Sequence, residues 1–364
     1  MTNREQEILN IIKENPMISQ QNLADKVGIS RSSVAVHISN LISKGAILGK
    51  GYVVSEDSYI VVIGGANIDI CGKPTNSIVK QDSNPGVVSI SAGGVGRNIA
   101  QNLSLLNQNV KFFTAFGGDT NAEMIKSSFN KAKIDFHDSL TIKNESTSSY
   151  LFITDEKGEM QLAISDMEIY KYMTKKFIAG KLDIINNAIL CIFDTNLPQE
   201  TIEFIAEKVS VPIFVDPVST AKMKKLLNIF DKIHTMKPNK LETELLTDVK
   251  ISDEKTLDYA ASKLIEKGIK NVYVSLGKNG VYFKSKNEAF HLPCLKTDIV
   301  NTTGAGDTFI ASIAYAFSSG MNSLDSAKLG LAGSAICIES KDTINTELSE
   351  ENILKRAGLI KKQA

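Results

Sequence analysis

A glycine-rich segment near the C-terminal end places a carboxylate beside unobstructed backbone. Gly304, Ala305 and Gly306 precede Asp307, and the apolar residues 309–311 that follow predict a helix. Backbone N–H groups at a helix start have no partner within the helix and carry the positive end of its dipole, which suits an anion. Asp307 could take a proton from an attacking hydroxyl. The pattern indicates phosphate transfer; its plain alternative is a glycine-rich turn with Asp307 as a first-turn residue.

Two upstream segments carry residue types that bind hydroxyl groups. Gly93 and Gly94 run into an amphipathic helix, so a ligand can lie against bare backbone there, and the amide of Asn98 can both donate and accept. Asn67 and Asp69 follow the first buried strand, at the end where ligands bind in parallel sheets. A carboxylate in that place can accept two hydrogen bonds from a diol. Each segment alone could equally be a structural turn.

Two further segments suit a nucleotide. Asn239 and Glu242 are three residues apart on one face of a starting helix, where they could hold a hydrated Mg²⁺ and nucleotide phosphates. Ser275, Gly277 and Gly280 lie at a strand end, where the glycines leave room for phosphate or ribose.

Alternating strands and helices from residue 59 onward must position these segments. The first strand is an apolar run over 59–65 that ends in glycines. Further strand-like runs lie at 110–115, 188–193, 212–215, 271–276 and 280–283, and amphipathic helices at 96–107, 198–208 and 253–267. We therefore expect an α/β fold with a mostly parallel sheet sandwiched by helices. Residues 66–91 and 147–164 are more polar and β-rich, which predicts a small projecting sheet.

The first 55 residues form a separate α+β pattern. Three short amphipathic helices are predicted, with a tight turn at Gly28 between the second and third and capping serines at positions 19 and 30. A short hairpin over 45–54 follows. This order resembles the winged helix-turn-helix of bacterial transcription regulators. We expect one domain over 1–55 and a second over 59–357.

The outward face of the third helix supplies the candidate DNA contacts. It carries Arg31, Ser32, Ser33, His37 and Lys44, whose side chains could reach base edges and phosphates. Residues 1–54 hold six basic and four acidic side chains, a net charge of +2, which is modest for a DNA-binding domain. The alternative is a solvated helix in an accessory or dimerisation domain.

Composition excludes some classes of protein. Lys plus Arg equals Asp plus Glu, at 41 each in 364 residues, so no overall field points to nucleic acid or a membrane. The N-terminus is polar and no apolar run approaches about 20 residues, which argues against a signal peptide or a membrane span. The four cysteines are far apart and have apolar neighbours, which predicts buried, reduced thiols and a cytoplasmic protein.

Together, the five segments resemble the ribokinase-like (PfkB) carbohydrate kinases over roughly residues 59–357. The resemblance implies that Asp307 is the base that activates a primary hydroxyl and that ATP and Mg²⁺ are needed. It also implies that the projecting sheet is a lid, which in this family often forms the dimer contact. The implied anion hole is Gly304, Ala305 and Gly306; the implied sugar site is Asn67, Asp69, Gly93, Gly94 and Asn98; the implied ATP contacts are Asn239, Ser275, Gly277 and Gly280, with Glu242 organising Mg²⁺.

Departures from the ribokinase pattern shift the expected acceptor. Val95 stands where ribokinases usually have lysine, and Asn301 where they have aspartate near a monovalent-cation loop, which puts activation by K⁺ in doubt. The sequence of residues 93–98, Gly-Gly-Val-Gly-Arg-Asn, is similar to the corresponding motif of the pseudouridine kinase branch, and the Asp166-Met167 pair is also similar to that branch. The resemblance thus implies 5′-phosphorylation of pseudouridine, with Asp166 as a candidate contact to the base.

Two other functions stay open at this point. One is a kinase of a free sugar, such as ribose or fructose, or of another nucleoside. The other is a ligand-sensing transcriptional regulator whose kinase domain is inactive, against which stands the presence of the full set of implied catalytic residues. DNA binding and kinase activity could also coexist in a homodimer.

Overall fold

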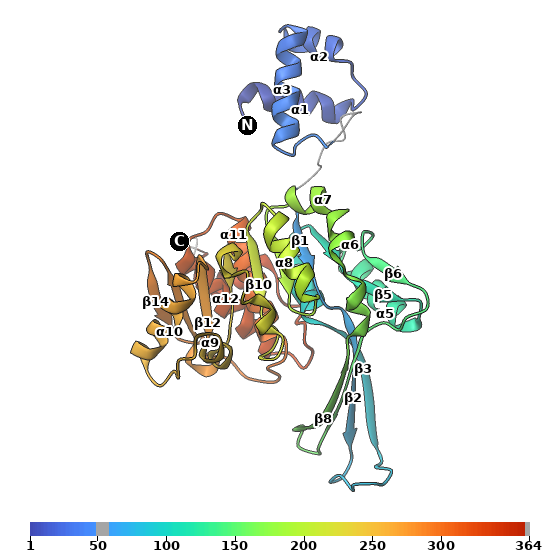
Figure 1. Cartoon of the computed structure of the whole chain (residues 1–364), viewed down its shortest axis with the longest axis vertical. Helices are drawn as coiled ribbons and strands as arrows, with labels where there is room; N and C mark the ends of the chain where they lie inside the picture. The colour runs from blue at the N-terminus through green and yellow to red at the C-terminus, as the bar shows by residue number, and fades with distance from the viewer. Residues whose placement is uncertain (49–57, 361–364) are drawn as a thin grey trace. The chain divides into compact units, whose positions relative to one another are not determined.

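The computed structural model describes residues 1–48 and 58–360, which fall into two compact units, Met1–Ser58 and Tyr59–Ala364 (Figure 1). Most of the hairpin predicted over 45–54 lies outside the described residues and stays a prediction.

The smaller unit is a three-helix cluster whose helix ends follow from its capping residues. Its helices are α1 (Asn3–Glu14), α2 (Gln20–Val27) and α3 (Arg31–Ser43). The hydroxyls of Ser19 and Ser30 each accept a hydrogen bond from the backbone of the helix they precede, at 3.1 Å in both cases. Gly28 ends α2 with φ +67°, a left-handed conformation that glycine adopts without strain. Ile8, Leu23 and Leu41 are fully buried between the helices.

A mostly parallel sheet forms the centre of the larger unit, which confirms the expected α/β fold. Its strand order is β14-β13-β12-β11-β10-β9-β1-β4, and only the β12–β13 and β13–β14 pairs are antiparallel. The bounds are β1 (Ile60–Ile63), β4 (Val110–Phe113), β9 (Cys191–Asp194), β10 (Ile213–Asp216), β11 (Thr235–Met236), β12 (Asn271–Ser275), β13 (Val281–Ser285) and β14 (Ala289–Leu292).

Helices cover both faces of this sheet because its strands are apolar on both sides. In β1, Ile60 and Val62 join one core cluster, whereas Val61 and Ile63 join the other. Helices of the first cluster are α4 (Val95–Leu105), α5 (Thr120–Lys131), α11 (Ala305–Ser318), α12 (Ser323–Ile338) and α13 (Glu350–Arg356). Helices of the second are α6 (Lys175–Ala179), α7 (Leu182–Asn186), α8 (Gln199–Lys208), α9 (Lys240–Thr247) and α10 (Glu254–Glu266).

A second sheet of four strands projects from the body (Figure 1). It has the order β3-β2-β7-β8, with β2 (Asn67–Pro74), β3 (Gly86–Gly93), β7 (Ser149–Thr154) and β8 (Met160–Asp166). The remaining elements are a two-stranded sheet, β5 (Ala115–Gly117) with β6 (Leu140–Ile142), and short 3₁₀ helices over 168–172, 223–226, 230–232 and 277–279.

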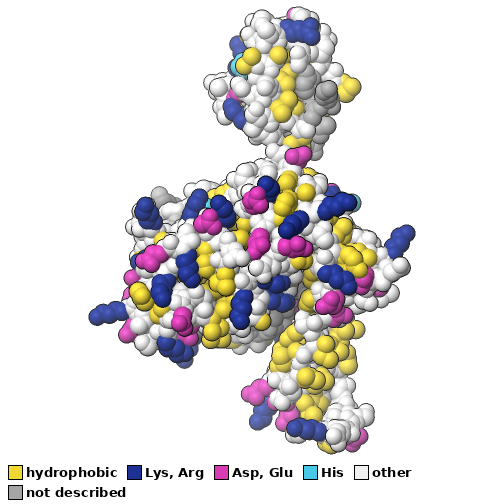
Figure 2. All heavy atoms as spheres, viewed as in Figure 1, with side chains coloured by type: hydrophobic (Ala, Val, Ile, Leu, Met, Phe, Trp, Pro, Cys, Tyr) yellow, Lys and Arg dark blue, Asp and Glu magenta, His cyan; other side chains and the backbone are white. Residues whose placement is uncertain are grey.

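The register of the projecting sheet gives it two different faces. Directly paired residues share a face, and successive residues alternate between faces. One face, which we call the aliphatic face, has the rows Ile90–Ile70–Leu151–Ile164 and Val88–Gly72–Ile153–Leu162. The other, which we call the aromatic face, has the rows Ser91–Asp69–Tyr150–Ser165 and Ser89–Cys71–Phe152–Ala163. Figure 2 shows hydrophobic side chains gathered over this sheet.

The expectation of buried, reduced cysteines is met only in part. All four cysteines are free, and Cys191 and Cys337 are buried as expected, but Cys71 is half-buried and Cys294 is exposed, so the expectation of buried thiols is wrong at these two positions. The Cys294 sulfur donates to the carbonyl of Gly277 at 3.0 Å.

Within the described ranges, none of the helices has the length and apolar character that a membrane span requires.

Candidate active site

The carboxyl ends of the parallel strands bring several charged side chains to one edge of the sheet. Asp194 and Asp216 are the last residues of β9 and β10, Ser275 is the last residue of β12, and Lys237 directly follows β11. Neighbouring parallel strands end on the same side, which is where ligands bind in such sheets. The residues predicted for the kinase site lie around this edge, apart from Asp166, whose place is described below.

Asp194 holds the two glycine loops together, a role that the sequence analysis missed. Its Oδ2 accepts hydrogen bonds from the N–H groups of Gly65, at 2.7 Å, and Gly96, at 2.9 Å. A side chain at Gly64 would overlap the same carboxylate, so only glycine fits there. Burial raises the pKa of Asp194, although hydrogen bonds from the backbone N–H groups of Gly65 and Asn196 act against the rise. Asp194 could have been found by asking which carboxylate ends an apolar strand.

The sugar side of the site is built around Asp69. The amide of Asn67 donates to Asp69 Oδ1 at 2.6 Å. A side chain at Gly93 would overlap the Asp69 carboxylate, and one at Gly94, where φ is +103°, would overlap the Gly65 carbonyl. Burial raises the pKa of Asp69, against the Asn67 hydrogen bond and the nearby Arg97 charge. The glycine pair therefore leaves the carboxylate open to a ligand on its free side.

Asn98 connects the glycine loop to Asp307. Its Nδ2 donates to Asp307 Oδ2 at 2.8 Å, across 209 residues of sequence. Its Oδ1 accepts a hydrogen bond of 3.1 Å from Arg97, which also donates to the Ala92 carbonyl at 2.8 Å. Because Arg97 donates to the amide oxygen, the amide nitrogen is directed at Asp307. Arg97 is thus a positioning residue that the sequence analysis did not single out.

Arg97 is also a buried cation between two carboxylates. The residue is 7% exposed, and its Nε has no partner among the described residues. Burial lowers the pKa of Arg97 to about 10, and the charges of Asp69 and Asp307 oppose this shift. Arg97 therefore stays protonated at neutral pH and balances two acids that would otherwise repel each other.

The glycine-rich segment adopts the expected helix start. Gly304 precedes α11 with φ +83°, and a side chain there would overlap the Thr343 carbonyl. In the described part of the chain, the N–H groups of Gly304 and Gly306 donate to no acceptor. The N–H of Ala305 makes only a long turn contact of 3.4 Å to Thr302. The segment therefore offers free donors to an anion, with the helix dipole behind them.

Asp307 stands in the third position of α11 and has an unusual environment for a carboxylate. Burial raises the pKa of Asp307 to about 8, and the negative charges of Asp216 and Asp194 add to the rise. The Asn98 hydrogen bond and the Lys237 charge act in the opposite direction. A carboxylate with a pKa near neutrality is suited to accept a proton from a hydroxyl.

Lys237 is a buried ammonium group that the sequence analysis missed. Its side chain is 7% exposed and its Nζ lies 3.3 Å from Asp216 Oδ2. A Cβ at Gly306 would lie 3.2 Å from this Nζ, so the ammonium adjoins the glycine-rich segment. Burial lowers the pKa of Lys237, but Asp216, Glu242 and Asp307 more than offset this, and the net shift is upward. No local pattern marked Lys237 in the sequence, because β11, the strand that it follows, has only two residues.

Asn239 and Glu242 come together, but they bind each other. Asn239 Oδ1 accepts from the Glu242 N–H and Glu242 Oε2 from the Asn239 N–H, both at 2.8 Å, which is a capping box at the start of α9. Glu242 Oε1 has no hydrogen-bond partner in the part of the chain that the structure describes, and burial raises the pKa of Glu242. Among the described residues, three or more His, Cys, Asp or Glu side chains nowhere gather as a metal site. A single carboxylate, Glu242, fits a Mg²⁺ ion that keeps most of its water ligands. It does not fit a metal ion held by protein ligands alone.

The two glycines at the nucleotide side differ in their roles. The Ser275 N–H donates to the Pro238 carbonyl at 2.9 Å, which joins this strand end to the start of α9. Gly277 has φ +57° and open space around its Cα, so a ligand can approach it. Gly280 has φ +92° and a side chain there would overlap the Leu292 carbonyl. Gly280 is therefore explained by packing against β14.

Asp166 is not brought to this group. It pairs with Ser149, which pairs with Ile68, so all three belong to the aliphatic side of the projecting sheet. Asp69 belongs to the aromatic face. A contact of Asp166 with a base held beside Asp69 would require it to reach around the sheet edge.

In the smaller unit, only part of the expected DNA face is free. Arg31 is exposed, but the hydroxyls of Ser32 and Ser33 each lie 2.8 Å from the Ser30 hydroxyl. His37 is half-buried and its Nδ1 has no partner among the described residues. Lys44, which was expected to face DNA, binds Glu5 at 2.8 Å.

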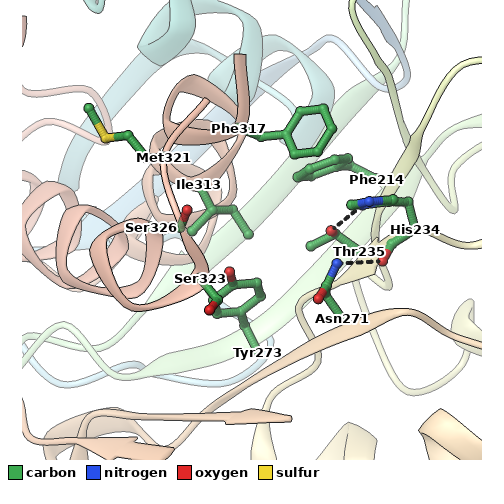
Figure 3. A pocket seen from close by; sticks show the side chains of 10 residues that line it. All are labelled: Phe214, His234, Thr235, Asn271, Tyr273, Ile313, Phe317, Met321, Ser323 and Ser326. Atoms are coloured by element: carbon green, nitrogen blue, oxygen red, sulfur yellow. Dashed lines mark hydrogen bonds between the residues drawn. The ribbon is translucent and has the colours of Figure 1, made fainter. Parts of the chain in front are cut away.

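A separate cavity of about 250 Å³ lies at the opposite, amino-terminal end of the strands (Figure 3). It is lined by Phe214, His234, Thr235, Asn271, Tyr273, Ile313, Phe317, Met321, Ser323 and Ser326. His234 stacks on Phe214, and burial lowers its pKa to about 4. None of the predicted site residues lines this cavity.

Comparison with known proteins agrees with this geometry. Residues 57–350 match the pfkB family carbohydrate kinase model, and residues 1–47 match a winged helix-turn-helix DNA-binding model. An uncharacterized sugar kinase of Escherichia coli, YeiI, is 36% identical over 362 residues, which is 99% of this chain and 100% of the relative. The pseudouridine kinase of E. coli is 35% identical over 302 residues, which is 82% of this chain and 96% of the relative.

Among solved structures, Arabidopsis thaliana ribokinase complexed with ribose and ATP has a TM-score of 0.74. It is 22% identical, and the match covers 82% of this chain and 98% of that one, a likeness of fold. With the family model spanning most of the sequence and the glycine-rich segment, Asp307 and the strand edge arranged as described, the chain belongs to the pfkB family of carbohydrate kinases and carries an N-terminal winged helix-turn-helix unit.

Proposed function

We propose that the protein is an ATP-dependent kinase that phosphorylates the primary 5′ hydroxyl of a ribosyl nucleoside, with pseudouridine as the acceptor. The observation that carries the proposal is the Asn98–Asp307 hydrogen bond beside the free N–H groups of the glycine-rich segment. The carboxylate that can act as a general base, Asp307, therefore lies next to the backbone N–H groups that can bind an anion. The similarity to the pseudouridine kinase of E. coli and the Arg97-Asn98 pair support the choice of acceptor.

Asp307 acts as the base in this proposal. A primary hydroxyl within reach of its carboxylate loses its proton to Asp307 as the oxygen attacks the γ-phosphoryl group. The N–H groups of Gly304 and Gly306, with Ala305 between them, face the charge on the transferred group. Lys237, next to Gly306, adds a positive charge on that side.

Asp69 and Asn67 bind the ribose diol, and the glycine pair at 93–94 lets the sugar ring lie against backbone. Asn98 fixes the orientation of Asp307 with one of its two amide hydrogens, and its Oδ1 accepts from Arg97. In this proposal the second amide hydrogen donates to a sugar hydroxyl. Asp166 takes no part in this proposal, since its side chain belongs to the other face.

ATP binds at the ends of β11 and β12 in this proposal. Ser275 and Gly277 border the nucleotide, Asn239 lies at the surface beside them, and Glu242 orients the water shell of Mg²⁺. The bound Mg²⁺ would neutralise phosphate charge during transfer. K⁺ remains a candidate activator, but the Asn301 amide accepts from the Thr303 N–H and donates to the Lys341 carbonyl. We expect activity in the absence of K⁺.

The projecting sheet serves as a lid and as the contact of a homodimer in this proposal. Val88, Ile90, Leu162 and Ile164 of its aliphatic face are all more than half exposed. A second copy of the chain that covers this face would bury these side chains. Ile90→Lys and Ile164→Lys should then yield a monomer in analytical ultracentrifugation, and a wild-type monomer would contradict the proposal.

A panel of acceptors tests the proposed reaction. Pseudouridine, uridine, adenosine, ribose and fructose are each assayed with ATP and Mg²⁺, and the site of phosphorylation is located by ³¹P–¹H NMR. We expect the highest kcat/KM with pseudouridine. Activity confined to a free sugar would overturn the nucleoside assignment, and binding without turnover of any acceptor would favour an inactive sensor.

A second function, DNA binding, is favoured by the winged helix-turn-helix match and by exposed Arg31 at the start of α3. We propose that the full-length protein binds its own promoter region through α3. Arg31→Ala should weaken binding, and log affinity should fall with log salt because phosphate contacts release counterions. Lys26→Ala, on α2, is the matched control. Equal binding by Arg31→Ala and wild type would assign α3 to an accessory role.

A further inference from the structure

The two faces of the projecting sheet differ in a way that points to the acceptor. The aliphatic face is wholly apolar over its two central rows, whereas the aromatic face mixes one carboxylate, two rings and small side chains. Aromatic side chains occur in these rows only on β7, at Tyr150 and Phe152. Their ring centroids are 5.5 Å apart with an angle of 34° between the planes. The two rings therefore act as one platform.

The platform begins beside the proposed sugar site. Tyr150 pairs directly with Asp69, and Phe152 pairs with Cys71, one step further along the strand. Neighbouring strands are about 4.8 Å apart, so the Tyr150 ring starts about one strand spacing from the carboxylate that holds the diol. The next positions across the sheet are small: Ser165 opposite Tyr150 and Ala163 opposite Phe152.

Core packing does not account for these rings. Both are partly exposed, and neither belongs to the hydrophobic cores of the larger unit. Within residues 1–48 and 58–360, the Tyr150 hydroxyl makes one contact, of 3.6 Å, with the Met160 sulfur. Exposed aromatic rings on a ligand-facing surface are typical stacking partners for a planar ring, and such stacking is tolerant of base identity.

We propose that Tyr150 and Phe152 form a platform on which the nucleobase of the acceptor stacks, so that these residues select a nucleoside over a free sugar. The inference rests on the proposed function. With the 5′ hydroxyl at Asp307 and the 2′,3′-diol at Asp69, the substituent on C1′ leaves the ribose on the side away from Asp307. The rings continue along β7 from the Asp69 row in the same outward direction.

The test compares a nucleoside with the same sugar lacking a base. kcat/KM is measured for pseudouridine and for ribose in wild type, Tyr150→Leu, Phe152→Leu and Tyr150→Phe. The two leucine variants should lower kcat/KM for pseudouridine by roughly tenfold to a hundredfold, mainly through KM, and leave ribose unchanged. Tyr150→Phe keeps the ring and should behave as wild type. If ribose turns over too slowly, its inhibition constant against pseudouridine replaces kcat/KM.

Leu151→Ala is the matched control, because Leu151 lies between the two rings in sequence but points to the aliphatic face. General damage to the lid would lower kcat/KM for pseudouridine and for ribose by the same factor. In Leu151→Ala the ratio of the two values should therefore equal the wild-type ratio. A ratio that is unchanged in both leucine variants overturns the platform while the proposed function stands. A wild-type enzyme that phosphorylates ribose but no nucleoside overturns the proposed acceptor, and the platform with it.

Discussion

Two carboxylates in different units hold the same position of a helix, yet their chemistry differs. Glu5 is the third residue of α1 in the smaller unit, and Asp307 is the third residue of α11 in the larger one. Each has a lysine nearby, Lys44 and Lys237. The pKa of Glu5 is lowered to about 2, whereas that of Asp307 is raised to about 8.

Hydrogen bonding explains the difference. The Glu5 carboxylate accepts from the Thr2 N–H, as half of a capping box with Thr2, and it also accepts from Lys44, with which it forms an ion pair. Asp307 follows Gly304, which has no side chain for such a box, and it receives one hydrogen bond from Asn98 while Asp216 and Asp194 repel its charge. A carboxylate with satisfied partners stabilises a helix, and one short of donors can act as a base.

The largest expected effect comes from Asp307→Asn. This change keeps the shape of the side chain but removes the base, so kcat should fall by at least about 10²–10⁴-fold. The thermal midpoint should not fall, because the variant removes a carboxyl group that burial and two neighbouring acids make costly to ionise. Steady-state kinetics and circular dichroism measure the two effects. Near-normal turnover would exclude Asp307 as the base.

Lys237→Met should have the next largest effect. Loss of one charge that faces the transferred phosphoryl group typically costs about 10²–10³-fold in kcat. The variant also leaves Asp216 unpaired, so the double variant Lys237→Met/Asp216→Asn serves as a control that restores charge balance. Stability should recover in the double variant while kcat stays low. Recovery of kcat as well would limit Lys237 to a structural role.

The pH dependence should follow the raised pKa of Asp307. Only the ionised carboxylate accepts a proton, so kcat/KM should rise with pH and level off above about 8. Below that value it should fall about tenfold per pH unit. Since the folded-state pKa lies above the unfolded one, Asp307 contributes stability at low pH that is lost as pH rises toward 8. The stability of Asp307→Asn should not fall in this range. A kcat/KM profile of wild type that is flat between pH 5 and 9 would refute Asp307 as the base.

The smallest effect on activity is expected for Glu5→Gln. Removing the charge weakens the pair with Lys44, so amide hydrogen exchange in α1 and α3 should become faster at neutral pH, while kcat is unchanged. The lowered pKa places the stabilising contribution above pH 4.5, to be lost as pH falls toward about 2. Wild type and variant should therefore converge in acid. A drop in kcat would mean that the two units are coupled.

Much of the fold could be predicted because its signals are local. Apolar runs such as 59–65 and 271–276 become β1 and β12, and the polar, β-rich segments become the projecting sheet. The strand β11 could not be found, since two residues carry no periodic pattern. The ion pair of Lys44 with Glu5 could not be foreseen, because the two residues are 39 positions apart in sequence.

The sequence by itself determined which residue types were present for chemistry: the glycine-rich segment with Asp307, the glycine pair before Asn98, and Asp69. It also determined the alternation of strands and helices that makes a parallel sheet, because strands that are buried on both faces consist of continuous apolar residues. Only the tertiary structure decided that Arg97 directs Asn98, that Lys237 adjoins Gly306, and that Asp166 and Tyr150 lie on opposite faces of one sheet. Those relations depend on strand register and on contacts between distant segments, which no local pattern encodes.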